Sequence, residues 1–220
     1  MIIYLVRAFE AMTDKQSFEI EEYPKNGRLA KYEKELAALE KAKDNEGIIT
    51  FSHRLFCDCS EYLKSTFQLH LSNLYLNFLN HREFTDLADK MDAIFGAIPR
   101  HRAMIVGDRL GSPPQIYIDF QNHIEGYRPA ETIVNLCASY MEELIHASDP
   151  NKNETQIQDI VCSAIEGFLE IKLPDALKQY RLDYSNTCDE LQAKKNLVVR
   201  KIKSSLSYPE FNKQLATGHR

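Results

Sequence analysis

The chain has 220 residues, of which 44% are hydrophobic and 27% are charged, and its formal net charge is −5. A chain of this length can bury one sizeable core, and its 11 Phe and 11 Tyr residues do not fit a disordered protein. No apolar run in the sequence approaches the roughly 20 residues that cross a bilayer. We therefore predict a single domain over residues 1–220, with no contact with a membrane.

The termini and cysteines indicate the compartment and the partners. The apolar run at residues 1–6 is shorter than the roughly 7–15 residues of a secretory signal core. Five cysteines are an odd number, which favours a reduced compartment over a disulfide framework. We predict a cytoplasmic protein. Residues 188–220 carry seven Lys/Arg and three Asp/Glu, and we interpret them as a basic C-terminal helical tail with a solvated face rather than a nucleic-acid site.

Hydrophobic spacing predicts the elements of the first half of the chain. Leu29, Tyr32 and Leu36 recur at the spacing of one helix face, and so do Leu63 and Phe67 further on. In chain order we predict a strand at 17–21, a helix at 28–46, a strand at 47–51, and helices at 60–80 and 83–97.

The second half alternates short apolar runs with longer amphipathic segments. Pro129 suits the first turn of a helix, and the pair Asp149 and Pro150 ends it. We predict strands at 103–106 and 115–120, helices at 129–147 and 153–171, and one or two helices over 175–212. The predicted fold class is α+β, mostly helical with a small β-sheet.

The 129–147 helix carries the most informative residues. Glu142 and His146 lie four residues apart and therefore share one helix face, with Glu143 beside them. On the next helix, Glu166 and Glu170 are also four residues apart. Two helices joined by a turn can place these faces opposite one another.

This arrangement resembles the gluzincins, the thermolysin-like branch of the zincin metallopeptidases. Their active-site helix carries His-Glu-x-x-His, and a Glu on the following helix is the third zinc ligand. The resemblance covers residues 115–171 and implies a zincin-like core there, with the strand at 115–120 as the edge strand that binds an extended peptide. It implies that Glu143 is the general base, that His146 and Glu166 are metal ligands, and that Glu170 supports them.

Glu142 stands where that family has its first His. A carboxylate can still ligate zinc, so Glu142, His146 and Glu166 are the predicted metal ligands. Two carboxylates make Mn²⁺ or Fe²⁺ alternatives to Zn²⁺. The resemblance implies either a metal-dependent peptidase acting on a peptide or protein substrate, or a catalytically inactive relative.

Other interpretations stay open at this stage. The chain is alternatively a metal-free, non-enzymatic helical interaction protein that meets a partner through the 28–46 helix or the basic tail. His53, Cys57 and Cys59 do not have a usual zinc spacing, and we interpret them as a partly buried thiol pair. His123 is a loop histidine near the predicted strands. The sequence indicates no oligomeric state.

Overall fold

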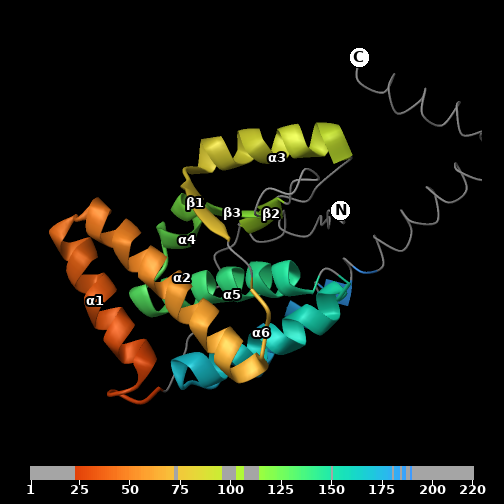
Figure 1. Ribbon diagram of the computed structural model, residues 1–220. Helices are drawn as coiled ribbons and strands as arrows, with labels where there is room; N and C mark the ends of the chain where they lie inside the picture. The colour runs from red at the N-terminus through yellow and green to blue at the C-terminus, as the bar shows by residue number, and fades with distance from the viewer. Residues whose placement is uncertain are drawn as a thin grey trace, which may run out of the picture.

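The structure is a computed structural model that describes residues 23–71, 74–95, 103–106, 114–149, 151–179, 181–183, 185, 186 and 189. It confirms the predicted α+β class, because most described residues are helical and a small sheet accompanies them (Figure 1). Its helices are α1 (Arg28–Ala42), α2 (Asn45–Phe67), α3 (His81–Phe95), α4 (Phe120–Ile124), α5 (Pro129–Ser148) and α6 (Glu154–Leu169), and its strands are β1 (Tyr75–Leu79), β2 (Ala103–Val106) and β3 (Gln115–Asp119).

The predicted strand at 47–51 is wrong, because these residues lie inside α2. The Asp44 carboxylate accepts a hydrogen bond of 2.9 Å from the Gly47 amide, and this cap starts the helix. The buried side chains of α2 then recur every three or four residues, which is the spacing of a helix with one face in the core. They are Ile48, Phe51, Ser52, Leu55, Phe56, Cys59 and Leu63.

The predicted helix at 60–80 is also wrong in its second half. Gln68 adopts a left-handed conformation with φ of 55° and ends α2. The chain then forms β1, which pairs in parallel with β3, from Tyr75 opposite Gln115 to Leu79 opposite Asp119. A strand partner 40 residues away therefore overrides the helical spacing of the apolar residues.

The sheet has the strand order β1-β3-β2, and β2 runs antiparallel to β3. The strand that directly precedes the α4–α5 region is therefore the central strand. This corrects the expectation that residues 115–120 form the edge strand; in the sheet described, β2 is the edge strand on the side of α5.

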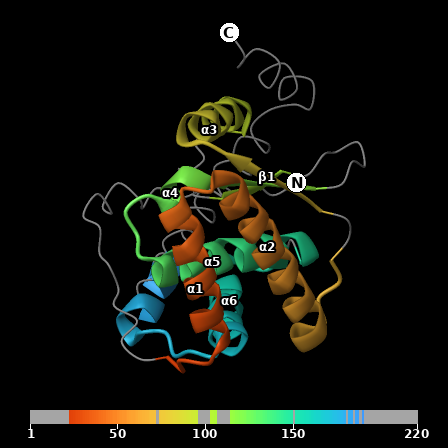
Figure 2. The same ribbon diagram turned by 90° about the vertical axis from the view of Figure 1, so that its left-hand side faces the viewer.

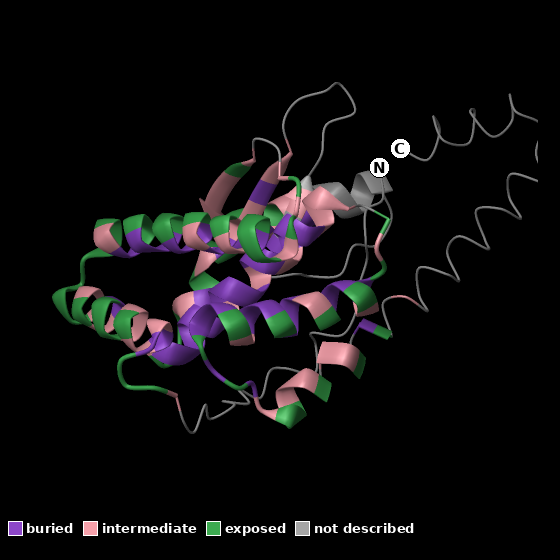
Figure 3. Ribbon diagram, turned by 60° about the horizontal axis from the view of Figure 1, so that its bottom comes forward, coloured by how far each residue is buried: buried purple, intermediate pink, exposed green. Residues whose placement is uncertain are grey.

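Helices cover both faces of this sheet (Figures 1 and 2). On one face, Phe84 and Ala88 of α3 pack in a small cluster with Leu79, Leu87 and Tyr117. On the other face lies α5, which contacts α1, α2, α4, α6 and β2. Of the 20 residues of α5, 13 are buried, and Figure 3 shows that buried residues gather where the helices face one another. The polar residues of α5 therefore lie close to the main core.

Three predictions fall wholly or mostly on residues that the structure does not describe. They are the strand at 17–21, the helices over 175–212 and the basic tail at 188–220. Within the part of the chain that is described, no helix combines the length and apolar character needed to span a membrane.

Candidate metal centre

The middle of α5 is mostly apolar, and its last two turns carry three ionisable side chains. Glu142 and His146 are one helical turn apart, and Glu143 adjoins Glu142. The surrounding positions Met141, Leu144 and Ile145 are fully buried. The core therefore fixes the rotation of α5 and, with it, the direction in which Glu142 and His146 point.

Helix α6 begins close to these residues because only residues 149–153 separate it from α5. The Asn153 side chain accepts a hydrogen bond of 2.9 Å from the Gln156 amide, and the Gln156 side chain accepts one of 3.1 Å from the Asn153 amide. This reciprocal capping box fixes the first turn of α6. Glu154 is the first residue of that turn.

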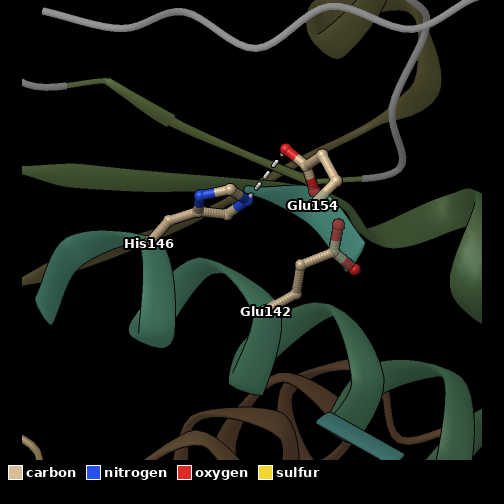
Figure 4. Close-up of side chains that lie close together, drawn as sticks. All are labelled: Glu142, His146 and Glu154. Carbon is tan, nitrogen blue, oxygen red and sulfur yellow. Dashed lines mark ion pairs between the residues drawn. The ribbon is translucent and has the colours of Figure 1, made fainter. Parts of the chain in front are cut away.

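Glu142, His146 and Glu154 converge on one another at the end of α5 and the start of α6 (Figure 4). One ligand atom from each lies within 4.8 Å of the other two. His146 Nε2 lies 3.3 Å from Glu154 Oε1. The side chains of His146 and Glu154 are 10% and 8% exposed and that of Glu142 is 20% exposed, so the group is largely buried with Glu142 as its most accessible member.

The donor set fits a divalent cation. Two ligand atoms that lie about 2 Å from a tetrahedral ion are about 3.3 Å apart, and the His146–Glu154 pair already has that spacing. One imidazole and two carboxylates are ligands for Zn²⁺, and the two carboxylates also suit Mn²⁺ and Fe²⁺.

The cluster contains two of the three predicted ligands but not Glu166. Twelve residues of helix separate Glu166 from Glu154, which is about 18 Å along the axis. Glu166 Oε1 instead accepts a hydrogen bond of 2.8 Å from the Leu173 amide and lies 2.6 Å from Lys178 Nζ. The structure therefore brings Glu154, and not Glu166, to Glu142 and His146.

Glu170 is also placed away from the cluster. It forms the C-cap of α6 in a left-handed conformation with φ of 59°. Its carboxylate accepts a hydrogen bond of 3.2 Å from the Arg28 amide, at the start of α1. Its role is thus to join the ends of two helices, and it does not contact the Glu142–His146–Glu154 cluster.

Glu143 is buried beside the cluster. Burial raises its pKa to about 8, and the nearby Glu142 and Glu154 carboxylates also raise it. His146 and a hydrogen bond from the backbone of Ile105 on β2 act in the opposite direction. Glu143 therefore connects the cluster to the edge strand.

Burial also acts on His146, where it disfavours the charged imidazolium. The hydrogen bond and charge of Glu154 outweigh it, and the pKa of His146 rises to about 9. Glu143 and Glu142 contribute in the same direction. Near neutral pH, and without a metal, His146 therefore carries a positive charge between acidic neighbours.

Two residues from beyond α6 reach the same region. Arg181 Nη2 lies 3.4 Å from Glu142 Oε2, and Arg181 Nε donates a hydrogen bond of 2.8 Å to Gln158. The Asp189 carboxylate accepts hydrogen bonds from the amides of Glu154 and Thr155, at 2.9 and 3.2 Å. The sequence pattern gives no signal for the contact of Arg181 with Glu142 or for the contacts of Asp189 with α6, because the residues that meet are more than 30 positions apart.

The weaker sequence signals lie elsewhere in the fold. His53 and Cys57 are exposed on α2, whereas Cys59 is buried and its Sγ lies 3.8 Å from that of Cys137. The predicted partly buried pair is therefore Cys57, which is exposed, and Cys59, which is buried. The loop placement of His123 is wrong: it lies in α4 and is fully buried, and its Nε2 is hydrogen-bonded to Ser139 Oγ at 2.9 Å.

No family model, no curated protein and no solved structure matches this chain. The resemblance to gluzincins therefore rests on the sequence of α5 alone, because Glu166 and Glu170 of α6 do not join the cluster.

Proposed function

We propose that this chain is a metal-dependent hydrolase of the zincin-like kind that cleaves a peptide bond. One divalent ion would be held by Glu142, His146 and Glu154. The observation that carries this proposal is the convergence of three ligand atoms within 4.8 Å of one another, from the end of one helix and the start of the next.

Glu143 is the proposed general base. A divalent ion in the cluster would polarise a substrate carbonyl and make water a better nucleophile. Glu143 would take the proton of the attacking water and pass it to the nitrogen of the leaving amine. Glu143 adjoins Glu142 on α5 and lies beside the cluster. Its pKa of about 8 in the metal-free chain leaves it largely protonated near neutral pH. A divalent ion in the cluster would lower that pKa and favour the carboxylate form that can accept the proton.

The cluster also has a metal-free interpretation, which is the second candidate function. His146 pairs with Glu154, and Arg181 pairs with Glu142, so each carboxylate of the cluster already has a cationic partner. A group compensated in this way would join α5, α6 and the chain beyond them in a non-enzymatic interaction protein.

Metal analysis combined with a hydrolysis assay distinguishes the two candidates. The purified chain is loaded with Zn²⁺ or Mn²⁺, dialysed, and assayed against a mixed library of fluorogenic peptides. The hydrolase proposal predicts about one retained ion per chain and a cleavage activity that a chelator removes.

The matched variant is Glu143→Gln. It is expected to retain the ion and to lose cleavage by about 100-fold or more. A wild-type chain that retains no ion contradicts the metal site. A chain that retains the ion but cleaves nothing contradicts the hydrolase and leaves a binding protein.

A further inference from the structure

Arg181 is the one residue among those described that brings a permanent positive charge into contact with a proposed metal ligand. Its guanidinium is anchored on α6 by Gln158 and reaches across to Glu142 on α5. The side chains of Arg181 and Glu142 are each only 20% exposed, so water screens their interaction incompletely.

A neighbouring residue offers a comparison. Lys178 lies three positions earlier and pairs with Glu166 at 2.6 Å. Glu166 is about 18 Å along α6 from the ligand Glu154. Lys178 and Arg181 therefore belong to the same part of the chain and pair with acidic residues, but only Arg181 contacts the cluster.

A divalent ion and Arg181 would compete for the same carboxylate. Arg181 Nη2 is 3.4 Å from Glu142 Oε2, and a ligated ion lies about 2 Å from its oxygen ligand, so the two cations would be about 6 Å apart or less. Even at the dielectric constant of water, the repulsion between charges of +2 and +1 at that separation corresponds to about a tenfold change in affinity.

We propose that Arg181 is a built-in cation that competes with the divalent ion for Glu142, so that binding of the ion releases Arg181 from α5. This inference rests on the proposed metal site and adds a means of regulating it. By linkage, anything that draws Arg181 away from Glu142 raises the affinity for the ion, and the ion favours the released state to the same extent.

The hydrogen bonds of Asp189 to α6 limit the release to the contact of Arg181 with α5. Asp189 holds the amides of Glu154 and Thr155 through hydrogen bonds to the backbone, and no ligand atom of the cluster takes part in them. The ion would therefore break the contact of Arg181 with α5 while Asp189 remains on the first turn of α6.

The test is a calorimetric titration of the full-length chain with Zn²⁺ at low ionic strength. The variants are Arg181→Gln and the matched control Lys178→Gln, which removes the same charge three residues away. We expect Arg181→Gln to bind Zn²⁺ about tenfold more tightly than wild type, and Lys178→Gln to stay within about twofold. Circular dichroism checks that each variant folds, and Arg181→Met, which also removes the charge, replaces Arg181→Gln if that variant does not. Arg181→Lys, which keeps the charge, is expected to bind Zn²⁺ as the wild type does.

The outcomes separate this inference from the proposed function. Arg181→Gln binding no more tightly than wild type, Lys178→Gln gaining as much, or Arg181→Lys gaining tenfold would each overturn the competition. Zn²⁺ binding to no variant contradicts the metal site itself. Zn²⁺ binding by Arg181→Gln and by no other protein supports the competition most strongly.

Hydrogen exchange gives a second readout. Zn²⁺ is expected to speed amide exchange in a peptide covering residues 175–183 of the wild type, and unchanged exchange contradicts the release.

Discussion

His146 and Glu154 form an ion pair that is nearly closed to water. The pKa of His146 is raised from 6.5 to about 9 in the folded protein. A raised folded-state pKa means that the pair stabilises the fold fully below pH 6.5, and that this contribution is lost as the pH rises through 9. The pKa of Glu143 is also raised, to about 8. Its titration therefore likewise lowers the stability of the fold as the pH rises.

We therefore expect the free energy of unfolding of the metal-free protein to fall between about pH 6.5 and 9, by roughly 3 kcal/mol for His146 alone. Urea unfolding of chelator-treated protein at a series of pH values measures this. His146→Gln is the comparison, since it lacks the titrating group and should give a flatter profile. Parallel profiles for the two proteins would show that His146 is not the group responsible.

The proposed ligand residues were only partly predictable from the sequence. The spacing of Glu142 and His146 places them on one face of any helix, and the structure keeps them together. Glu166 has the spacing of the third ligand in the family that the sequence resembles, but the connection after Ser148 is only five residues long. His146 lies near the end of α5, so its neighbours on the next helix come from the first turn, where Glu154 lies.

At the scale of elements, the first turn of α6 depends on Asp189. Its carboxylate accepts from the amides of Glu154 and Thr155 and, at 2.8 Å, from the Thr155 hydroxyl. These amides have no partner within the helix. We expect Asp189→Ala to lower the free energy of unfolding by about 1 kcal/mol, and Asp159→Ala, on the exposed side of α6, to change it by less than about 0.5 kcal/mol.

Urea unfolding at fixed pH measures both variants. An equal effect of the two substitutions would mean that Asp189 does not cap α6 in solution.

The errors in element prediction share a physical cause. Ile48, Ile49 and Thr50 are β-branched and favour a strand locally, but the Asp44 cap and the core contacts of Phe51 and Leu55 impose a helix. Conversely, β1 exists because β3 pairs with it, and a pairing so distant in sequence leaves no local signal. The predicted ranges of α5 and α6 match the structure to within two residues at each end, because Pro129 and Asn153 mark their first turns in the sequence.

At the scale of the whole molecule, α5 organises the core. Leu144 is fully buried on α5, between Glu142 and His146. Leu144→Ala is expected to lower the free energy of unfolding by about 2–5 kcal/mol, because it leaves a cavity in the core. Ile49→Ala, at a 41% exposed position, is expected to change it by less than about 1 kcal/mol. Denaturant unfolding measures both variants. Similar losses of unfolding free energy in the two would contradict the conclusion that α5 organises the core.

The central claim is that Glu142, His146 and Glu154 hold one divalent ion. The measurement that tests it most directly is a calorimetric Zn²⁺ titration of the wild type, Glu154→Gln and Glu166→Gln. Both substitutions remove one carboxylate charge from α6, but only Glu154 belongs to the cluster. We expect one ion per chain for the wild type and for Glu166→Gln, and at least about tenfold weaker binding for Glu154→Gln. Wild-type protein that binds no Zn²⁺, or equal binding by all three proteins, would contradict the claim.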